Sequence, residues 1–313
     1  MSSSRKAIFA ALASNCLIAI AKFIAGAITG SSAIMSEGVH SVVDMGNEIF
    51  LLYGLRRSKM PADEEFPFGH GKELYFWSFI VAILIFAGGA GVSILKGLNH
   101  LSAPTPGKDF YVNYIIIGFA MIFDGTSWYI SWKEFSKTKG KWGIVQAIHR
   151  SRDPSILAVF FENSADLLGL LAALLGIFLS HVTGISYFDG VASIVIGLIL
   201  CGMATLLAFK SKDLLIGESA NNEIVQGIRE IMNSFKEIEH VNEILTMQMG
   251  PDFILVNISV DFVDSISSSE VEAAIAKLDR KIKQTYPDVK RVFVEAEEWR
   301  TNNIAGSQSE AYT

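Results

Sequence analysis

The chain has 313 residues, of which 50% are hydrophobic and only 19% are charged. Because soluble domains usually carry about 25% charged residues, this composition indicates a membrane protein with a soluble part. The net charge of −6 and the lack of a basic tract argue against a nucleic-acid partner. The two cysteines, Cys16 and Cys201, lack the spacing of a disulfide framework or a thiolate metal site.

Six stretches are apolar enough to cross a membrane, since a spanning helix needs about 20 mostly apolar residues. They are residues 7–29, 33–55, 74–95, 110–132, 154–180 and 190–209. The N-terminal segment MSSSRK and the apolar run after it have features of a signal peptide. That run continues to residue 29 without a clear cleavage site, so we interpret it as a retained first span.

Lysine and arginine divide unevenly between the two sets of connections. If the N-terminus is cytoplasmic, the outside connections hold at most Lys96 and Lys108. The inside connections then hold Arg5, Lys6, Arg56, Arg57, Lys59, Lys72, Lys133, Lys137, Lys139, Lys141, Arg150, Arg152, Lys210 and Lys212. Because positive residues favour the cytoplasmic side, we expect both termini in the cytoplasm of a multi-pass protein in a plasma (inner) membrane.

From residue 213 the pattern changes to that of a small α+β domain. A helical pattern is followed by two strand-like runs, an amphipathic helix and a third strand, VKRVFVEAEEW. The order α-β-β-α-β predicts helices packed on one face of a sheet. We therefore expect a six-helix membrane domain over 1–212, a cytoplasmic α+β domain over 213–300 and a disordered polar tail over 301–313.

Ionisable side chains inside the predicted spans gather mainly in the second and fifth. The fifth span carries Glu162 and Asp166, four residues apart. The second carries four such residues on one stripe, less than about 90° wide on a helical wheel: Glu37, His40, Asp44 and Glu48. Such groups normally face a protein interior or a water-filled cavity. If the two helices pack face to face, the pairs His40–Asp44 and Glu162–Asp166 meet around one point.

A cation site explains these pairs better than interhelical hydrogen bonding, because anions concentrated in a low dielectric are costly unless a cation neutralises them. Glu37, near the outer mouth, and Glu48, toward the cytoplasm, either line a pathway or only reach water in a vestibule. In the loop 61–73, Asp63 and His70 form either a second metal site or part of a solvated charged loop.

Two glycines that follow the charged pairs, Gly46 and Gly169, are expected to permit close helix packing. The sequence contains no nucleotide-binding glycine motif, no HExxH pattern and no GxSxG elbow. We therefore do not expect an enzyme.

The segments EGVHSVVD, FENSADLLG, FGHGK and LLIGES, together with six spans before an α-β-β-α-β domain, resemble the cation diffusion facilitator family of proton-coupled divalent-metal exporters. The resemblance covers residues 5 to 299. It implies a transport site at His40, Asp44, Glu162 and Asp166, a ferredoxin-like C-terminal domain and a homodimer. In this dimer we expect Lys72 to make a charge contact with an acidic group such as Asp213 or Glu218.

The chain departs from the family pattern in three places. Glu162 stands where such proteins usually have His or Asp, and Phe66 stands between Asp63 and His70 where they often have a second His. Near the strands, the nearest matches to the family's cytoplasmic metal ligands are Asn242, Ser259, Glu295 and Glu297. The resemblance therefore implies a C-terminal domain that serves dimerisation more than metal sensing.

The ligand types at the predicted site limit the cargo. One imidazole and three carboxylates can bind zinc, three hard oxygens also suit manganese, and imidazole suits iron or cobalt. Protons compete with metal because the ligands must be deprotonated. We expect an exporter of zinc, or alternatively of manganese, iron or cobalt. It exchanges the metal for protons and holds no permanent cofactor. A cation channel and a metal-sensing membrane receptor are the alternatives of another class.

Overall fold

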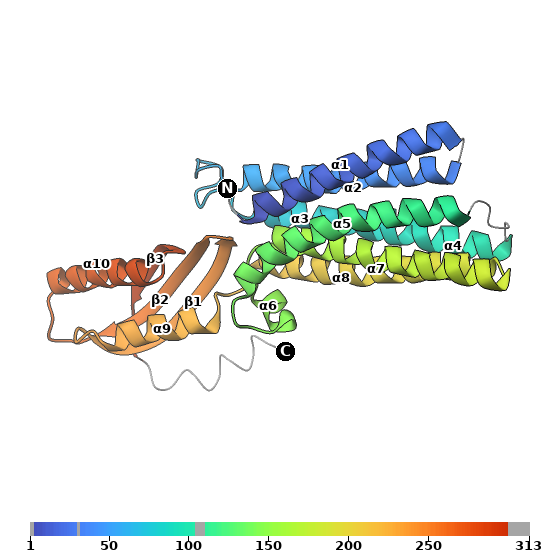
Figure 1. Ribbon diagram of the computed structural model, residues 1–313. Coiled ribbons are helices and arrows are strands. Elements are labelled where there is room, and N and C mark those ends of the chain that lie inside the picture. The colour runs from blue at the N-terminus through green and yellow to red at the C-terminus, as the bar shows by residue number, and fades with distance from the viewer. Residues whose placement is uncertain (1–2, 30–31, 104–109, 300–313) are drawn as a thin grey trace. The chain divides into compact units, whose positions relative to one another are not determined.

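The computed structural model describes residues 3–29, 32–103 and 110–299 (Figure 1). For residues 32–40 and some others in the first, second and fifth helices, only the backbone is described. The predicted disordered tail, 301–313, lies outside the described residues. The chain divides into two compact units, Met1–Ile216 and Gly217–Thr313.

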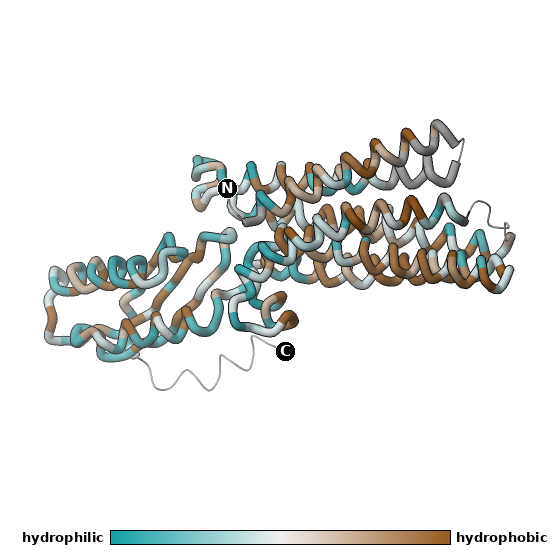
Figure 2. The backbone as a smooth tube through the Cα atoms, in the orientation of Figure 1, coloured by the Kyte–Doolittle hydropathy of each residue, from teal (hydrophilic) through white to brown (hydrophobic). Residues whose placement is uncertain are grey.

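The first unit consists of helices. They are α1 (Ser3–Thr29), α2 (Ser32–Arg57), α3 (Glu73–Leu84), the π-helix η1 (Ile85–Gly91), α4 (Val92–Ser102), α5 (Phe110–Lys139), α6 (Ile144–Arg150), α7 (Pro154–Thr183) and α8 (Tyr187–Ile216). Because α8 continues to Ile216, the expected domain boundary after residue 212 falls inside a helix. Figure 2 shows apolar residues along these helices and hydrophilic ones over much of the second unit.

Four stretches of the described chain are long and apolar enough to cross a membrane. They are Glu73–Ser102, Asn113–Lys139, Pro154–Thr183 and Tyr187–Ile216. Helices α1 and α2 have 27 and 26 residues, which is sufficient length for a span. Six spans, which require both of these helices as well, stay a prediction.

Close helix packing in the first unit depends on glycines between α4 and α8. A Cβ added at Gly97 or Gly197 would lie 2.6 Å or 2.5 Å from an isoleucine side chain of the facing helix, so both positions exclude larger residues. The expectation for Gly46 is wrong for the described residues, because a Cβ there would meet none of their atoms within 4 Å. At Gly169 it would lie 3.5 Å from Ile196, which is ordinary contact.

Helix α7 is the central helix of this unit and has clear signals at both ends. The Asp153 carboxylate caps its start by accepting a hydrogen bond from the Ser155 N–H at 3.0 Å, and Pro154 occupies the first turn. It ends at Gly184, whose φ of 71° favours glycine. Residues 154–163 are all buried, as expected of a helix surrounded by others. This burial places Glu162 inside the unit.

The described part of the second unit packs two helices with a three-stranded sheet. In chain order its elements are α9 (Asn222–Asn233), β1 (Ile238–Gly250), β2 (Phe253–Phe262), α10 (Ser268–Thr285) and β3 (Val289–Ala296). The central strand β2 pairs antiparallel with β1 and parallel with β3. Ile228 of α9, Leu278 of α10 and Val256 of β2 belong to its core. A small α+β domain is confirmed, whereas the ferredoxin-like classification stays a prediction.

A capping box begins α10. The Ser267 side chain accepts a hydrogen bond from the Glu270 N–H, and the Glu270 carboxylate accepts one from the Ser267 N–H at 2.7 Å. This backbone hydrogen bond lowers the pKa of Glu270.

Candidate metal site

A small cavity lies in the first unit where α2, the α3–η1 segment, α7 and α8 meet. Its lining residues are Asp44, Asn47, Leu84, Ile85, Gly89, Glu162, Asp166 and Leu200. Three of the four residues predicted for the transport site therefore line one cavity, with Asp44 on α2 and Glu162 and Asp166 on α7. The side chains of His40 and Glu37 lie outside the described residues, although both belong to α2.

The carboxylates share the cavity without converging on one point. Among the side chains that the structure describes, no three His, Cys, Asp or Glu residues gather closely enough to hold a metal ion. Glu162 is 5% exposed, and Asp44 and Asp166 are half-buried.

Asn47 is a member of the cavity that the sequence analysis missed. Its Nδ2 donates a hydrogen bond to Glu162 Oε1 at 2.9 Å. Asn47 is 2% exposed. Asn47 Oδ1 and Glu162 Oε2 are buried, and neither has a hydrogen-bond partner among the residues whose side chains the structure describes. A search limited to ionisable residues could not find it. The helical wheel held the signal, because at about 100° per residue Asn47 falls only about 20° from His40.

Glu48 is fully buried but does not belong to the cavity lining. Its Oε1 accepts a hydrogen bond from Asn15 Nδ2 at 2.8 Å, so α1 supplies the polar partner of this α2 carboxylate. Asn15 also escaped the sequence analysis. A pathway role for Glu37 and Glu48 stays a prediction.

One side of the cavity comes from the π-helix η1 and the residue before it. Leu84, Ile85 and Gly89 belong to the lining, and η1 interrupts what would otherwise be one straight apolar span. Single π-helical turns inside α-helices occur frequently at functional sites. The run IFAGGAG gave no sign of this interruption in the sequence.

Hydrogen bonds from α5 hold α7 in place at Asn163 and Ser164, the two residues that follow Glu162. Ser127 Oγ donates to Asn163 Oδ1, and Asn163 Nδ2 donates to Ser131 Oγ, both at 3.2 Å. Trp128 Nε1 donates to Ser164 Oγ at 3.0 Å. These contacts fix the rotation of α7 about its axis, which orients its carboxylates.

Comparison with known families decides what kind of protein contains this cavity. Residues 8–216 match the cation efflux transmembrane domain, which is about two-thirds of the chain. The chain belongs to this family. Residues 220–299 match a second description, the cytoplasmic domain of cation efflux proteins. The relatives matched are transporters rather than enzymes.

Three relatives of this cation efflux protein carry names that specify a cargo or an activity. The mitochondrial proton-coupled zinc antiporter SLC30A9 of Xenopus laevis is 29% identical over 82% of this chain and 46% of its own length. The manganese efflux system protein MneP of Bacillus subtilis is 22% identical over 93% of this chain and 95% of its own length. The cation-efflux pump FieF of Escherichia coli is 26% identical over 90% of this chain and 89% of its own length. The chain therefore spans about half of the SLC30A9 relative and nearly all of the bacterial ones.

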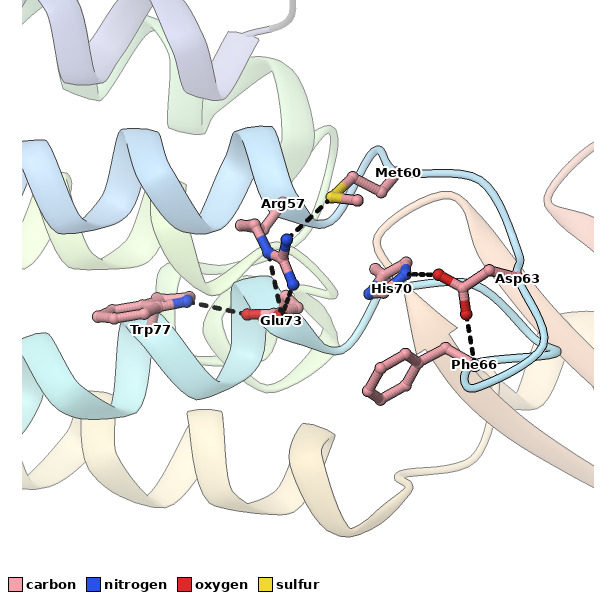
Figure 3. A network of polar contacts seen from close by, with 7 residues as sticks. All are labelled: Arg57, Met60, Asp63, Phe66, His70, Glu73 and Trp77. Atoms are coloured by element: carbon pink, nitrogen blue, oxygen red, sulfur yellow. Dashed lines mark hydrogen bonds and ion pairs between the residues drawn. The ribbon is translucent and has the colours of Figure 1, made fainter.

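The loop between α2 and α3 of this cation efflux protein brings Asp63 and His70 together (Figure 3). His70 Nε2 lies 2.9 Å from Asp63 Oδ2, and the Phe66 N–H donates to Asp63 Oδ1 at 2.7 Å. The Phe66 ring also contacts the imidazole, with a centroid distance of 4.6 Å. The hydrogen bond with His70 lowers the pKa of Asp63. These contacts hold a turn together, and a second metal site here stays a prediction.

The ends of that loop are held by a second network in Figure 3. Arg57 Nη2 at the end of α2 lies 3.2 Å from Glu73 Oε1 at the start of α3. Trp77 Nε1 donates to Glu73 Oε2 at 2.9 Å, and the Trp77 ring stacks on Phe50 at a centroid distance of 5.4 Å. This network fixes α2 against α3 at one end.

Lys72, for which a charge contact across a dimer is predicted, makes a contact within its own unit. Its Nζ donates to the Leu215 carbonyl oxygen at 3.3 Å, which ties the start of α3 to the end of α8. Desolvation lowers the pKa of Lys72. Asp213, a candidate partner, lies 3.0 Å from Lys212 Nζ. The contact of Lys72 across a dimer stays a prediction.

In the second unit, three of the four residues that most nearly match the family's cytoplasmic metal ligands form a hydrogen-bonded cluster. Asn242 Nδ2 donates to Ser259 Oγ at 3.2 Å and to the Glu297 carbonyl oxygen at 2.9 Å. Ser259 Oγ donates to Glu297 Oε2 at 3.0 Å. Hydrogen bonds between these three residues therefore link β1, β2 and the segment after β3.

Proposed function

We propose that this cation efflux protein is a secondary transporter that exports a divalent transition-metal cation, zinc first, from the cytoplasm in exchange for protons. The observation that carries the proposal is the cavity lined by Asp44, Glu162 and Asp166 inside an apolar helical unit. Carboxylates in such a place are costly unless a cation or protons neutralise them. A site that binds either one in turn is suited to exchange.

In this mechanism the cation binds between α2 and α7. His40 and Asp44 supply ligands from α2, and Glu162 and Asp166 supply them from α7. Because the described carboxylates line the cavity without converging, the ion draws the two helices together when it binds. Alternating access follows if this closure opens the site to the other side of the membrane.

Proton coupling arises because metal and protons compete for the same ligands. Near neutral pH a bound metal displaces protons, and a more acidic outer side returns protons and releases the metal. The name of the SLC30A9 relative, a proton-coupled zinc antiporter, supports this exchange. We place zinc first because an imidazole with carboxylates can form a tetrahedral zinc site.

Manganese is the second candidate cargo, with iron and cobalt after it. The observation that favours manganese is the oxygen-rich lining, in which Glu162 takes the place of an imidazole and Asn47 adds an amide oxygen. The name of the MneP relative supports it as well.

Transport by the purified protein in liposomes tests this function. With a proton gradient, uptake of zinc or manganese should saturate with metal concentration and should stop when the gradient is dissipated. Metal affinity should fall as pH decreases from about 7.5 to about 5.5, because protons then compete more strongly with the metal for its ligands. Non-saturating flux that ignores the gradient would indicate a channel instead.

Six spans with both termini in the cytoplasm form the proposed topology, which the distribution of lysine and arginine supports. Single cysteines in a variant without Cys16 and Cys201 test it. A cysteine between α4 and α5 should react with an impermeant reagent added outside intact cells. A cysteine at residue 306 should react only after the membrane is opened, and its labelling from outside would contradict this topology.

A homodimer assembled through the C-terminal α+β unit is the proposed assembly, supported by the match to the cytoplasmic domain of cation efflux proteins. Light scattering on the purified protein should give the mass of two chains. Deletion of residues 213–313 should weaken this dimer. An unchanged dimer after the deletion would assign dimerisation to the membrane helices.

A further inference from the structure

The amide of Asn47 has a determined orientation within the cavity. An ionised carboxylate only accepts hydrogen bonds, so Asn47 must turn its NH₂ group toward Glu162, as the 2.9 Å contact from Nδ2 to Oε1 records. The carbonyl oxygen Oδ1 is then directed away from that contact. Among the side chains that the structure describes, Asn47 Oδ1 is buried without a hydrogen-bond partner, and Asn47 is 2% exposed.

The second oxygen of Glu162 is in the same situation. Glu162 Oε2 is also buried and has no hydrogen-bond partner in the described part of the chain, and both residues line the cavity with Asp44 and Asp166. Buried polar atoms are nearly always paired, so two unpaired acceptors beside one cavity require an explanation. A cation in the cavity would satisfy both oxygens at once, because it is attracted to acceptors and needs no donor.

We propose that Asn47 is a ligand of the transported cation, with Oδ1 facing the ion while its NH₂ group holds the Glu162 carboxylate. This inference rests on the proposed function and deepens it. Carboxamide and carboxylate oxygens are hard ligands, and an additional oxygen raises the ligand number above the four of tetrahedral zinc. Asn47 therefore favours Mn²⁺ over Zn²⁺ at this site.

The test compares Mn²⁺ and Zn²⁺ affinities of the full-length protein in nanodiscs by calorimetric titration. Asn47→Leu removes the oxygen and keeps the volume. It should weaken Mn²⁺ binding by at least about 100-fold, which is more than the loss of a residue that only supports a ligand costs, with a smaller loss for Zn²⁺. Asn163→Leu is the matched control, since Asn163 is a buried asparagine beside Glu162 whose amide bonds to α5 instead. Because Asn163 orients α7 but does not line the cavity, this variant should lower both affinities by a similar factor and keep the wild-type ratio of Mn²⁺ to Zn²⁺ affinity.

A second comparison separates a ligand from a residue that only positions Glu162. In a Glu162→Ala background, Asn47→Leu should still weaken Mn²⁺ binding, whereas a residue that acts only through Glu162 would have no further effect. Asn47→Asp in the same background should restore Mn²⁺ affinity, because a carboxylate oxygen returns to the ion. This rescue also decides the matter if the leucine variant does not fold.

The outcomes separate this inference from the proposed function. If the wild type binds neither Mn²⁺ nor Zn²⁺, the proposed function itself fails. If the wild type binds them and Asn47→Leu lowers both affinities equally, or if the aspartate fails to rescue, Asn47 is not a ligand and only this inference is overturned.

Discussion

Replacement of Asp44 or Asp166 by alanine is expected to abolish metal transport. Both residues line the cavity, one on α2 and one on α7, and each carboxylate offsets one positive charge of the ion. Loss of either leaves an uncompensated charge in a low dielectric. Loss of a residue that merely supports a ligand costs 10- to 100-fold, so loss of a ligand should lower flux in liposomes by more than about 100-fold.

Asp213→Ala is the matched control for this prediction. Asp213 is an exposed acid near the end of α8 whose carboxylate pairs with Lys212 at 3.0 Å. The variant changes the net charge of the first unit equally and should transport metal as the wild type does. Near-normal flux through Asp44→Ala or Asp166→Ala, in protein that elutes as a single species, would contradict the site.

Much of the helical unit could be predicted because membrane insertion imposes simple rules on sequence. Length and apolarity identified the stretches that became α5, α7 and α8, since a spanning helix must be both long and apolar. The carboxylates of the cavity were found because charge in such a helix is rare and conspicuous. In the pairs His40–Asp44 and Glu162–Asp166, the spacing of four residues placed both members of a pair on one helix face.

Other parts of the site have no such signature. Asn47 and Asn15 carry no charge, so nothing in a search for ionisable groups distinguished them from polar residues that join helices. The π-helix η1 depends on how α3 and α4 pack against their neighbours, and α8 in particular contacts both α4 and η1. The close packing assigned to Gly46 was wrong because which face of α2 meets a neighbour is a tertiary property.

The largest expected change in metal selectivity comes from Glu162→His. Glu162 accepts a hydrogen bond from Asn47 and is 5% exposed, so its replacement changes the ligand set inside the cavity itself. A histidine there would give the proposed site two imidazoles and two carboxylates, a combination typical of tetrahedral zinc. It would also remove one of the hard oxygens that suit manganese or iron.

We expect Glu162→His to keep zinc transport and to lose manganese or iron transport relative to the wild type. The ratio of zinc to manganese flux in liposomes should rise at least about 10-fold, which corresponds to about 1.4 kcal/mol of difference between the two ions. Parallel assays of Glu162→Ala distinguish the roles of the side chain. If histidine and alanine have the same effect on every metal, Glu162 acts through its charge or as a proton carrier. If Glu162→Ala transports metal normally, Glu162 is not a ligand and the four-residue site proposed on α2 and α7 is wrong.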